Sequence, residues 1–223
     1  AIKNGASGLT TYRVQDGTST YLSGCATVTI TPDSSGTGGV ASVDFGSTYC
    51  ECLDGHYRSG IINFTYTGPY SDSGTVITTS FDNYYVGKDT AHMFKVTGTK
   101  TVTNNGQNAS GHTHFTIDVN GHLTDATGRN MDWTSTCDRE WVAGESTLTW
   151  QDDEYYITGN AQGTNFEGNS YTMSISQALD VDFSCHWIKS GTFNLTPTGK
   201  ATRTFDYGDG TCDNKASVTV NGT

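Results

Sequence analysis

Apolar and polar residues alternate in short stretches along this whole chain, and this alternation restricts the fold more than any other feature. Val28 and Ile30 alternate with threonines, and Met173 and Ile175 flank Ser174 in the same way. A period of two places the apolar side chains of a strand on one face of a sheet. No segment repeats apolar residues at helical spacing over three turns. The sequence therefore predicts an all-β protein built from antiparallel sheets with one buried face.

Turn signals separate the alternating segments at intervals of about ten residues, which is typical of a β-sandwich. The best hairpin candidate is Asn120-Gly121, between the apolar residues of 115–119 and Leu123. We expect an antiparallel β-sandwich of immunoglobulin-like or related topology. With 223 residues, the chain is long enough for one continuous sandwich or two tandem related domains. The tandem interpretation has an N-terminal strand segment at 1–24 and sandwich domains at 25–107 and 108–223.

One short motif occurs twice, near opposite ends of the chain. Asp44-Phe45-Gly46 is followed by Cys50, and Asp206-Tyr207-Gly208 is followed by Cys212, six residues after the aspartate in both cases. A catalytic site has no need of a second copy, so the repeat indicates a structural unit made of a strand, a turn and a cysteine.

The chain holds six cysteines, which predict up to three disulfides and an oxidising compartment. We prefer the pair Cys185–Cys212, because a hairpin-like strand pair lies between the two residues. Cys25 then pairs with Cys50 or Cys52. The alternative is that some cysteines are thiols packed as small hydrophobic residues. The complete set is Cys25, Cys50, Cys52, Cys137, Cys185 and Cys212.

The net charge of -11 argues against a nucleic-acid partner, because phosphate binding needs clustered Lys and Arg. It also argues against an anionic membrane surface. No apolar run approaches the roughly 18 residues that a membrane-spanning helix needs, so we expect no membrane insertion. The cysteines and the composition predict a secreted protein, located outside the cell or on its outer surface. The small residue Ala1 fits a mature chain whose leader has been removed.

Candidate metal ligands are few. Asp206, Asp209 and Asp213 share one Gly-rich loop and could offer oxygen ligands to Ca²⁺, although aspartate is also simply common in turns. His112 and His114 flank Thr113 and point to one face, but without a third ligand a surface pair is the simpler interpretation. We therefore expect no cofactor other than Ca²⁺ at these aspartates and predict no further metal site.

None of the familiar catalytic motifs occurs in the sequence. There is no hydrolase nucleophile elbow, zinc-protease motif, phosphate-binding loop or dinucleotide fingerprint. We therefore predict no catalytic residues.

Aromatic residues suggest a possible glycan-binding surface. In adjacent tyrosine pairs on a strand, one ring faces the core and the other faces solvent, where it could stack on a sugar. Core packing is the alternative for each ring. The rings concerned are Trp133, Trp141, Trp150 and Trp187 with the pairs Tyr84-Tyr85 and Tyr155-Tyr156.

The ends of the chain suggest a way to polymerise. The segment 9–22 contains the strand formers Leu9, Tyr12 and Val14, and Asn221-Gly222 follows a strand where a partner strand is expected. An open sheet edge recruits strands. We expect the N-terminal segment of a neighbouring copy to act as donor strand and fill this edge, giving a head-to-tail homopolymer. Pairing of that segment within its own chain is the simpler alternative.

Part of the sequence resembles a known family. The stretches 185–191 and 205–216, which contain Cys185-His186-Trp187 and Asp209-Gly210-Thr211-Cys212, are similar to an uncharacterised family of secreted or lipid-anchored β-rich surface proteins of Bacteroidota. Further similar stretches are 43–46, 58–68 and 98–104. The resemblance implies an exported, surface-associated β protein without an assigned reaction, whose members continue past the final Asn-Gly into one more short strand.

Four residues are candidate glycosylation sites. Asn63, Asn108 and Asn194 fit the N-glycosylation acceptor, and Asp89-Thr90-Ala91 resembles the short O-glycosylation acceptor of Bacteroidota at Thr90.

Together these observations predict a non-enzymatic, exported structural or adhesive surface protein. Its sharpest form is the subunit of a pilus-like extracellular filament, or fimbrium, joined by N-terminal donor-strand exchange. A glycan-binding surface module is the alternative, and an enzyme acting on polysaccharide is third.

Overall fold

A computed structural model describes residues 26–147 and 149–221 of the chain. Every regular element in this part is a β-strand, as the alternation predicts. The strands are β1 (Thr27–Pro32), β2 (Gly39–Asp44), β3 (Cys50–Glu51), β4 (Tyr57–Tyr66), β5 (Val76–Gly87), β6 (Met93–Gln107), β7 (Thr113–Thr124), β8 (Asn130–Ala143), β9 (Glu154–Thr164), β10 (Ser170–Asp182), β11 (Ser190–Pro197), β12 (Arg203–Asp209) and β13 (Ser217–Val220).

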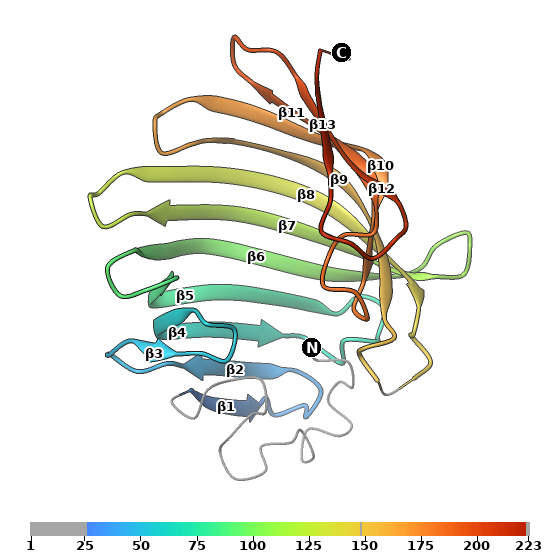
Figure 1. Cartoon of the computed structure of the whole chain (residues 1–223). Coiled ribbons are helices and arrows are strands. Elements are labelled where there is room, and N and C mark those ends of the chain that lie inside the picture. Colours follow the sequence, from blue (N-terminus) through green and yellow to red (C-terminus); the bar gives the residue numbers. More distant parts are fainter. Residues whose placement is uncertain (1–25, 148, 222–223) are drawn as a thin grey trace.

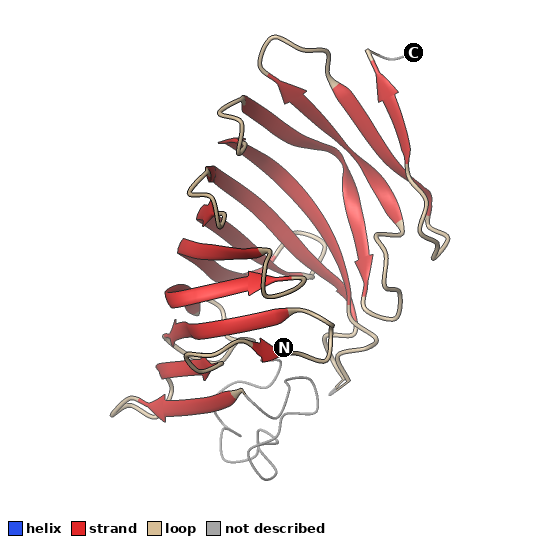
Figure 2. Ribbon diagram, turned by 60° about the vertical axis from the view of Figure 1, so that its left-hand side comes forward, coloured by secondary structure: helices blue, strands red, loops and turns tan. Residues whose placement is uncertain are grey.

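These strands form one antiparallel sheet in which each strand, apart from the short β3, pairs with the strands before and after it in the chain. Twelve of them follow one path from β1 to β13, and the short β3 pairs with β4 beside that path. Figure 1 shows the strands stacked in chain order, from blue β1 to red β13, and Figure 2 shows how strongly the sheet curves. The sheet is not closed. The all-β, antiparallel expectation is confirmed.

The sandwich and the tandem domains are not confirmed. The described strands lie in a single sheet, and the expected boundary between 25–107 and 108–223 falls in the turn between β6 and β7. These two strands pair from Lys95 with Thr124 to Gln107 with Thr113, so the ladder continues across that position. Alternation specifies strands with one apolar face, but it is the same for a sandwich and for one large curved sheet.

The strand register lines up polar residues from edge to edge on one face of the sheet, which we call the polar face. Directly opposed residues of antiparallel strands share a face, so two rows can be followed across the sheet. Apart from Val40, every member is Thr, Ser, Asn, Gln or Asp. One row is Thr29, Ser42, Asn63, Ser80, Thr99, Asn120, Thr134, Gln162, Thr172 and Thr196; the other is Thr31, Val40, Thr65, Thr78, Thr101, Asp118, Thr136, Asn160, Ser174, Asn194, Thr204 and Thr219.

The opposite side, which we call the apolar face, carries the alternate residues. On β8, for example, Thr134 and Thr136 are exposed whereas Ser135 and Cys137 are half-buried. Matched apolar residues of this face include Val28, Val43 and Ile62 near β1, Val102 and Ile117 in the centre, and Phe193, Phe205 and Val218 near β13. Hydrophobic burial is therefore concentrated on one side of the sheet.

Two compact clusters provide the buried core. Near the N-terminal strands, Phe45 and Tyr84 pack with Ala26, Cys50 and Cys52. In the second cluster the fully buried Phe115 packs with Trp141 and Tyr155, and Tyr70 from the β4–β5 turn stacks on Phe115 with ring centroids 4.7 Å apart. Burying such a side chain stabilises the fold by about 1.5–3 kcal/mol. The β4–β5 turn thus covers the sheet where its largest apolar side chains gather.

The repeated motif forms the same turn at both places. Asp44 Oδ1 accepts a hydrogen bond from the Gly46 N–H at 2.7 Å, and Asp206 Oδ1 accepts one from the Gly208 N–H at 2.8 Å. The first motif begins at the last residue of β2, and the second lies near the end of β12, which continues to Asp209. Both cysteines that follow, Cys50 and Cys212, are disulfide-bonded. The two copies of the motif thus share one local hydrogen bond and a disulfide-bonded cysteine.

A pair of glycines lets β6 and β7 approach closely. Gly98 lies opposite Gly121 and has a φ of +108°, and a Cβ built on Gly98 would lie 2.0 Å from the Asn120 carbonyl oxygen. A Cβ on Gly121 would meet the Trp133 ring at 2.3 Å. The indole therefore covers the gap that the absent side chain leaves.

We expect Gly98→Ala to destabilise the sheet by more than the roughly 1–3 kcal/mol that an unfavourable backbone angle costs, because the new methyl group also collides with backbone. Urea unfolding measures the difference. Gly128→Ala is the matched control, since Gly128 has a φ of +84° with no atom within 4 Å of its Cβ position. Equal losses in the two variants would contradict the close-approach explanation.

Candidate functional site

The two edges of the sheet are the first candidate site. Among residues 26–147 and 149–221, β1 pairs only with β2 and β13 only with β12. The twelve-strand path is an even number of antiparallel strands, so β1 and β13 run in opposite directions. An edge strand presents backbone N–H and C=O groups to any strand that approaches.

The hydrogen-bond pattern shows which residues of β13 face outward. The Asn221 N–H donates to the Thr202 carbonyl at 3.1 Å, and bonded pairs recur at every second residue of an antiparallel ladder. Thr219 therefore continues the bonded set towards β12, and Val218 turns its backbone groups to the open side. The Val218 side chain is on the apolar face and is 52% exposed.

β1 has the same arrangement at the other edge. The Asp33 N–H donates to the Gly38 carbonyl at 2.9 Å, so Thr31 and Thr29 continue the bonded set towards β2. Val28 and Ile30 direct their backbone groups outward. At both edges the outward-facing backbone thus belongs to residues whose side chains lie on the apolar face.

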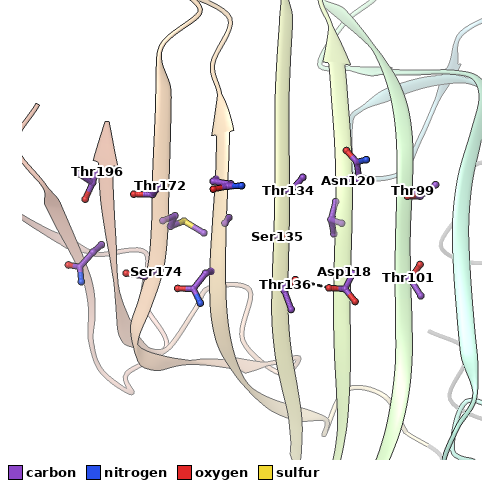
Figure 3. Close-up of a pocket in the computed structure, with 16 residues that line it drawn as sticks. Thr99, Thr101, Asp118, Asn120, Thr134, Ser135, Thr136, Thr172, Ser174 and Thr196 are labelled. Carbon is purple, nitrogen blue, oxygen red and sulfur yellow. Dashed lines mark hydrogen bonds between the residues drawn. The ribbon is translucent and has the colours of Figure 1, made fainter. Parts of the chain in front are cut away.

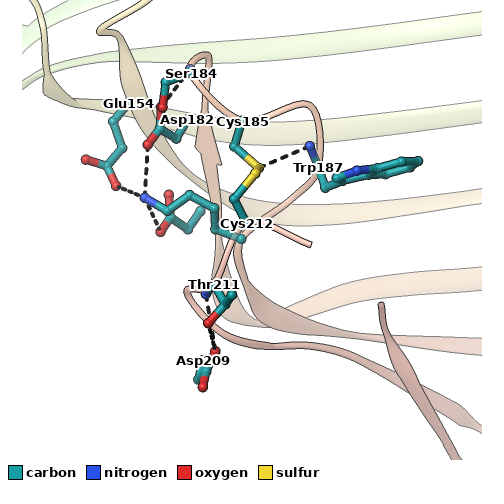
Figure 4. Close-up of polar contacts among 10 residues, drawn as sticks. Glu154, Asp182, Ser184, Cys185, Trp187, Asp209, Thr211 and Cys212 are labelled. Carbon is teal, nitrogen blue, oxygen red and sulfur yellow. Dashed lines mark hydrogen bonds and ion pairs between the residues drawn. A yellow bond between two sulfur atoms is a disulfide. The ribbon is translucent and has the colours of Figure 1, made fainter. Parts of the chain in front are cut away.

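A disulfide and an ion cluster brace the corner next to β13. Cys185 and Cys212 are bonded with sulfurs 2.01 Å apart, which confirms the predicted pair (Figure 4). Lys189 Nζ lies 3.1 Å from both Glu154 and Asp182 and 3.5 Å from Asp180. This corner therefore ties β9 and β10 to the segment that leads into β11.

The electrostatics of this cluster follow from one ammonium among three carboxylates. Hydrogen bonding to Asp182, and then to Glu154, raises the pKa of Lys189. Asp180 is 7% exposed, and desolvation raises the pKa of its carboxyl group. The Lys189 side chain is only 19% exposed, so the charges are partly shielded from solvent.

A groove on the polar face is the second candidate site. It has a volume of about 540 Å³, crosses β6 to β11 and is lined by residues of both polar rows (Figure 3). Thr136 donates to Asp118 at 2.7 Å across it. The side-chain amides of Asn120, Asn160 and Gln162 make no hydrogen bond with any other described residue. The groove therefore offers unused donors and acceptors.

The predicted histidine pair meets carboxylates rather than a shared ligand. His112 Nδ1 lies 2.7 Å from Glu140 and His114 Nδ1 lies 2.7 Å from Asp138, so each histidine pairs with a carboxylate of β8. Hydrogen bonds from Asn108, and then from His112, lower the pKa of Glu140. Within the described ranges no three His, Cys, Asp or Glu side chains converge as metal ligands.

The three loop aspartates are engaged in their own turns. Asp206 accepts from Gly208, Asp209 from Thr211 and Asp213 from Lys215. The second of these contacts is visible in Figure 4. Ca²⁺ binding by these residues stays a prediction.

One tyrosine of each pair is buried as the alternation predicts, and its neighbour is half-buried in the case of Tyr85 and exposed in the case of Tyr156. Tyr84 and Tyr155 are buried at 6% and 5% exposure, whereas Tyr156 is 42% exposed. Trp141 belongs to the second core cluster, and Trp187 is 48% exposed beside the disulfide. The exposed rings lie apart from the groove, so no aromatic platform lines it.

The remaining candidates are dispersed. Cys52 and Cys137 are thiols, which agrees with the alternative stated for some cysteines, and Cys25 lies outside the described residues, as do Leu9, Tyr12 and Val14. Of the glycosylation candidates, Thr90 is exposed in the β5–β6 turn and Asn63 is half-buried on the polar face. Asn108 and Asn194 are half-buried and hydrogen-bond to Glu140 and Thr204.

Sequence reasoning missed the groove residues, because no local motif marks them. Their signal was the threonine, serine and asparagine set between the apolar residues of each strand. Only the register shows that these sets align across neighbouring strands.

No protein-family model, curated protein or solved structure matches this chain. In the described part there is also no helix long and apolar enough to cross a membrane.

We expect Cys185→Ser combined with Cys212→Ser to lower the free energy of unfolding by about 3–4 kcal/mol, since the disulfide closes a 27-residue separation. Denaturant unfolding measures the loss, and Cys137→Ser is the control that removes a sulfur without removing a bridge. A loss no larger than that of the control would show that the bridge does not stabilise this corner.

Proposed function

We propose that this protein is a non-enzymatic, exported structural component of the cell surface, whose copies join head to tail through the open edges of the sheet. The observation that carries the proposal is that the two edge strands β1 and β13 match in three respects. They run in opposite directions, alternate residues of each turn their backbone N–H and C=O groups outward, and the side chains of those residues lie on the apolar face. The bridge between Cys185 and Cys212 fits an oxidising compartment, which supports an extracellular location.

The strand directions at the two edges are compatible with such a join. Because β1 and β13 are antiparallel within one copy, a second copy placed in the same orientation brings its β1 antiparallel to the first copy's β13. The two strands at the join are then antiparallel, like every other strand pair in the sheet. A heterologous contact of this kind gives an open filament wherever the rotation between successive copies does not close a ring.

The outward backbone groups and the two faces of the sheet can be matched in the same alignment. The outward backbone groups belong to Val218 on one edge and to Val28 and Ile30 on the other. Opposing these residues makes a bonded pair and also places their side chains on one face. The polar face of one copy would continue into that of the next, with Thr219 near Thr29 and Thr31.

The predicted donor segment 1–24 lies just upstream of β1 and outside the described residues. Its residues Leu9, Tyr12 and Val14 stay candidates for a donor strand, and exchange of this segment remains a prediction. The N-terminal edge that the described structure offers is β1 itself.

Val218→Pro tests the join, because proline removes the outward N–H of Val218 while Thr219 keeps its bonds to β12. We expect filaments of the unaltered chain in electron micrographs and none from the variant. Val218→Thr is the control, since it changes the side chain and leaves the backbone donor intact. A monomeric unaltered chain, or a proline variant that polymerises normally, would falsify the proposal.

Mixing the variant with the unaltered chain tests whether the join brings together two different edges. The Val218→Pro variant keeps an intact β1 edge, so an excess of it should cap and shorten filaments of the unaltered chain. A symmetric pairing of two β13 edges would instead stop at dimers, so no filament would form for the variant to shorten.

The groove favours a second function, binding of a neutral glycan chain. Hydroxyl and amide groups recur on successive strands about 4.8 Å apart, and such a repeat suits a polymer with a regular array of hydroxyls. Asp118 is the single charged residue that lines the groove. Without an aromatic platform, hydrogen bonds would carry the affinity.

Asn160→Ala combined with Gln162→Ala tests glycan binding. Affinity electrophoresis in gels containing soluble xylan, mannan or β-glucan should show retardation of the unaltered chain by at least one polymer. The double variant should bind about tenfold more weakly, since two hydrogen bonds are lost. Asn63→Ala is the control on the polar face outside the groove, and equal retardation of all three proteins would exclude the groove as the site.

A further inference from the structure

Two positive charges lie on the apolar face without a carboxylate partner. Lys100 occupies a β6 position in register with Val119, and Arg139 occupies a β8 position in register with Phe115. Neither forms an ion pair with any described residue, although the chain carries a net charge of -11. Acidic residues are thus plentiful, yet no described carboxylate lies within ion-pair distance of these two cations. The buried Asp153 accepts a hydrogen bond from the hydroxyl of Tyr155, whose ring lies against Arg139.

Aromatic rings hold Arg139 in place. Its Cζ lies 5.0 Å from the Phe115 ring centroid and 4.9 Å from that of Tyr155, and its Nη2 donates to the Tyr70 hydroxyl. Ring faces attract a guanidinium without neutralising it. The Arg139 Nε–H is buried and has no acceptor. The guanidinium thus keeps one donor that the described residues leave unused.

Lys100 adds a second, more accessible charge. Its side chain is exposed and makes no hydrogen bond with any other described residue. Partial desolvation, and then the nearby charge of Arg139, lower the pKa of its ammonium group. The two like charges act on each other across the face, and an anion placed between them would relieve that repulsion.

The surface between the two cations is apolar. Val102, Ile117 and Cys137 form the cross-strand row that separates the Lys100 row from Phe115 and Arg139. All three are half-buried rather than covered. One end of this strip is closed by Tyr70, which stacks on Phe115. Along the other direction the apolar face continues from β9 towards β13.

We propose that the apolar face binds a free long-chain fatty acid, with the carboxylate at Lys100 and Arg139 and the acyl chain over the adjoining apolar residues. One carboxylate has two oxygens and can accept from an ammonium and a guanidinium together. A single acyl chain matches one strip of side chains, whereas a phospholipid places two chains beside a larger headgroup. The site is independent of the sheet edges and of the polar groove.

Lys100→Gln is the main test, because its side chain is exposed and the change should not disturb the core. Binding of palmitate is measured by calorimetry below its micelle concentration, with hexadecanol as the uncharged chain of equal length. We expect saturable palmitate binding, weakened about tenfold or more in the variant through loss of a charge-assisted hydrogen bond. Hexadecanol should bind weakly to both proteins, with no difference between them.

Lys95→Gln is the matched control, since Lys95 lies on the same strand β6 at a polar-face position, in register with Thr124. It should bind palmitate like the unaltered chain. Equal effects of the two substitutions would show that the weaker binding comes from the change in net charge alone, and would overturn the proposal. So would hexadecanol binding as tight as palmitate, absence of saturable binding, or binding only to vesicles of anionic phospholipid.

Discussion

The backbone ladder of one uninterrupted antiparallel sheet is the constraint on which the rest of this structure depends. Apart from the short β3, each strand pairs with the strands before and after it in the chain, and the two-residue repeat of a strand then decides on which face every side chain lies. A slip of one residue at any strand would exchange the two faces from that point on. The polar rows, the apolar strip and the phase of both edges are therefore consequences of a single register.

Some of this organisation follows directly from the sequence and some does not. Alternation around Val28, Ile30 and Met173 specifies strands, and the repeated aspartate–glycine–cysteine unit specifies a turn that the structure forms twice. Cys185 and Cys212 could be paired because a hairpin lies between them. All of these features depend on residues close together in the chain.

The number of layers could not be derived in this way. Whether strands with one apolar face fold into two packed sheets or into one large sheet depends on which strands pair, and the local pattern is identical. Likewise, Lys100 and Arg139 are unremarkable in the sequence. Their significance comes from the strands between them, which place both cations on the same face beside Val102 and Ile117.

The connection of every strand to its sequence neighbour also has a consequence for how the molecule assembles during synthesis. Among the described residues, substantial strand-to-strand contact occurs only between elements adjacent in the sheet. Contact order there is therefore low, and no long loop must close before the first native pairs form. Each new hairpin can pair with the edge of the sheet that has already formed, as repeats add to a solenoid. Nucleation could then begin at any hairpin, and the last strands to be added would be the ones most prone to fray.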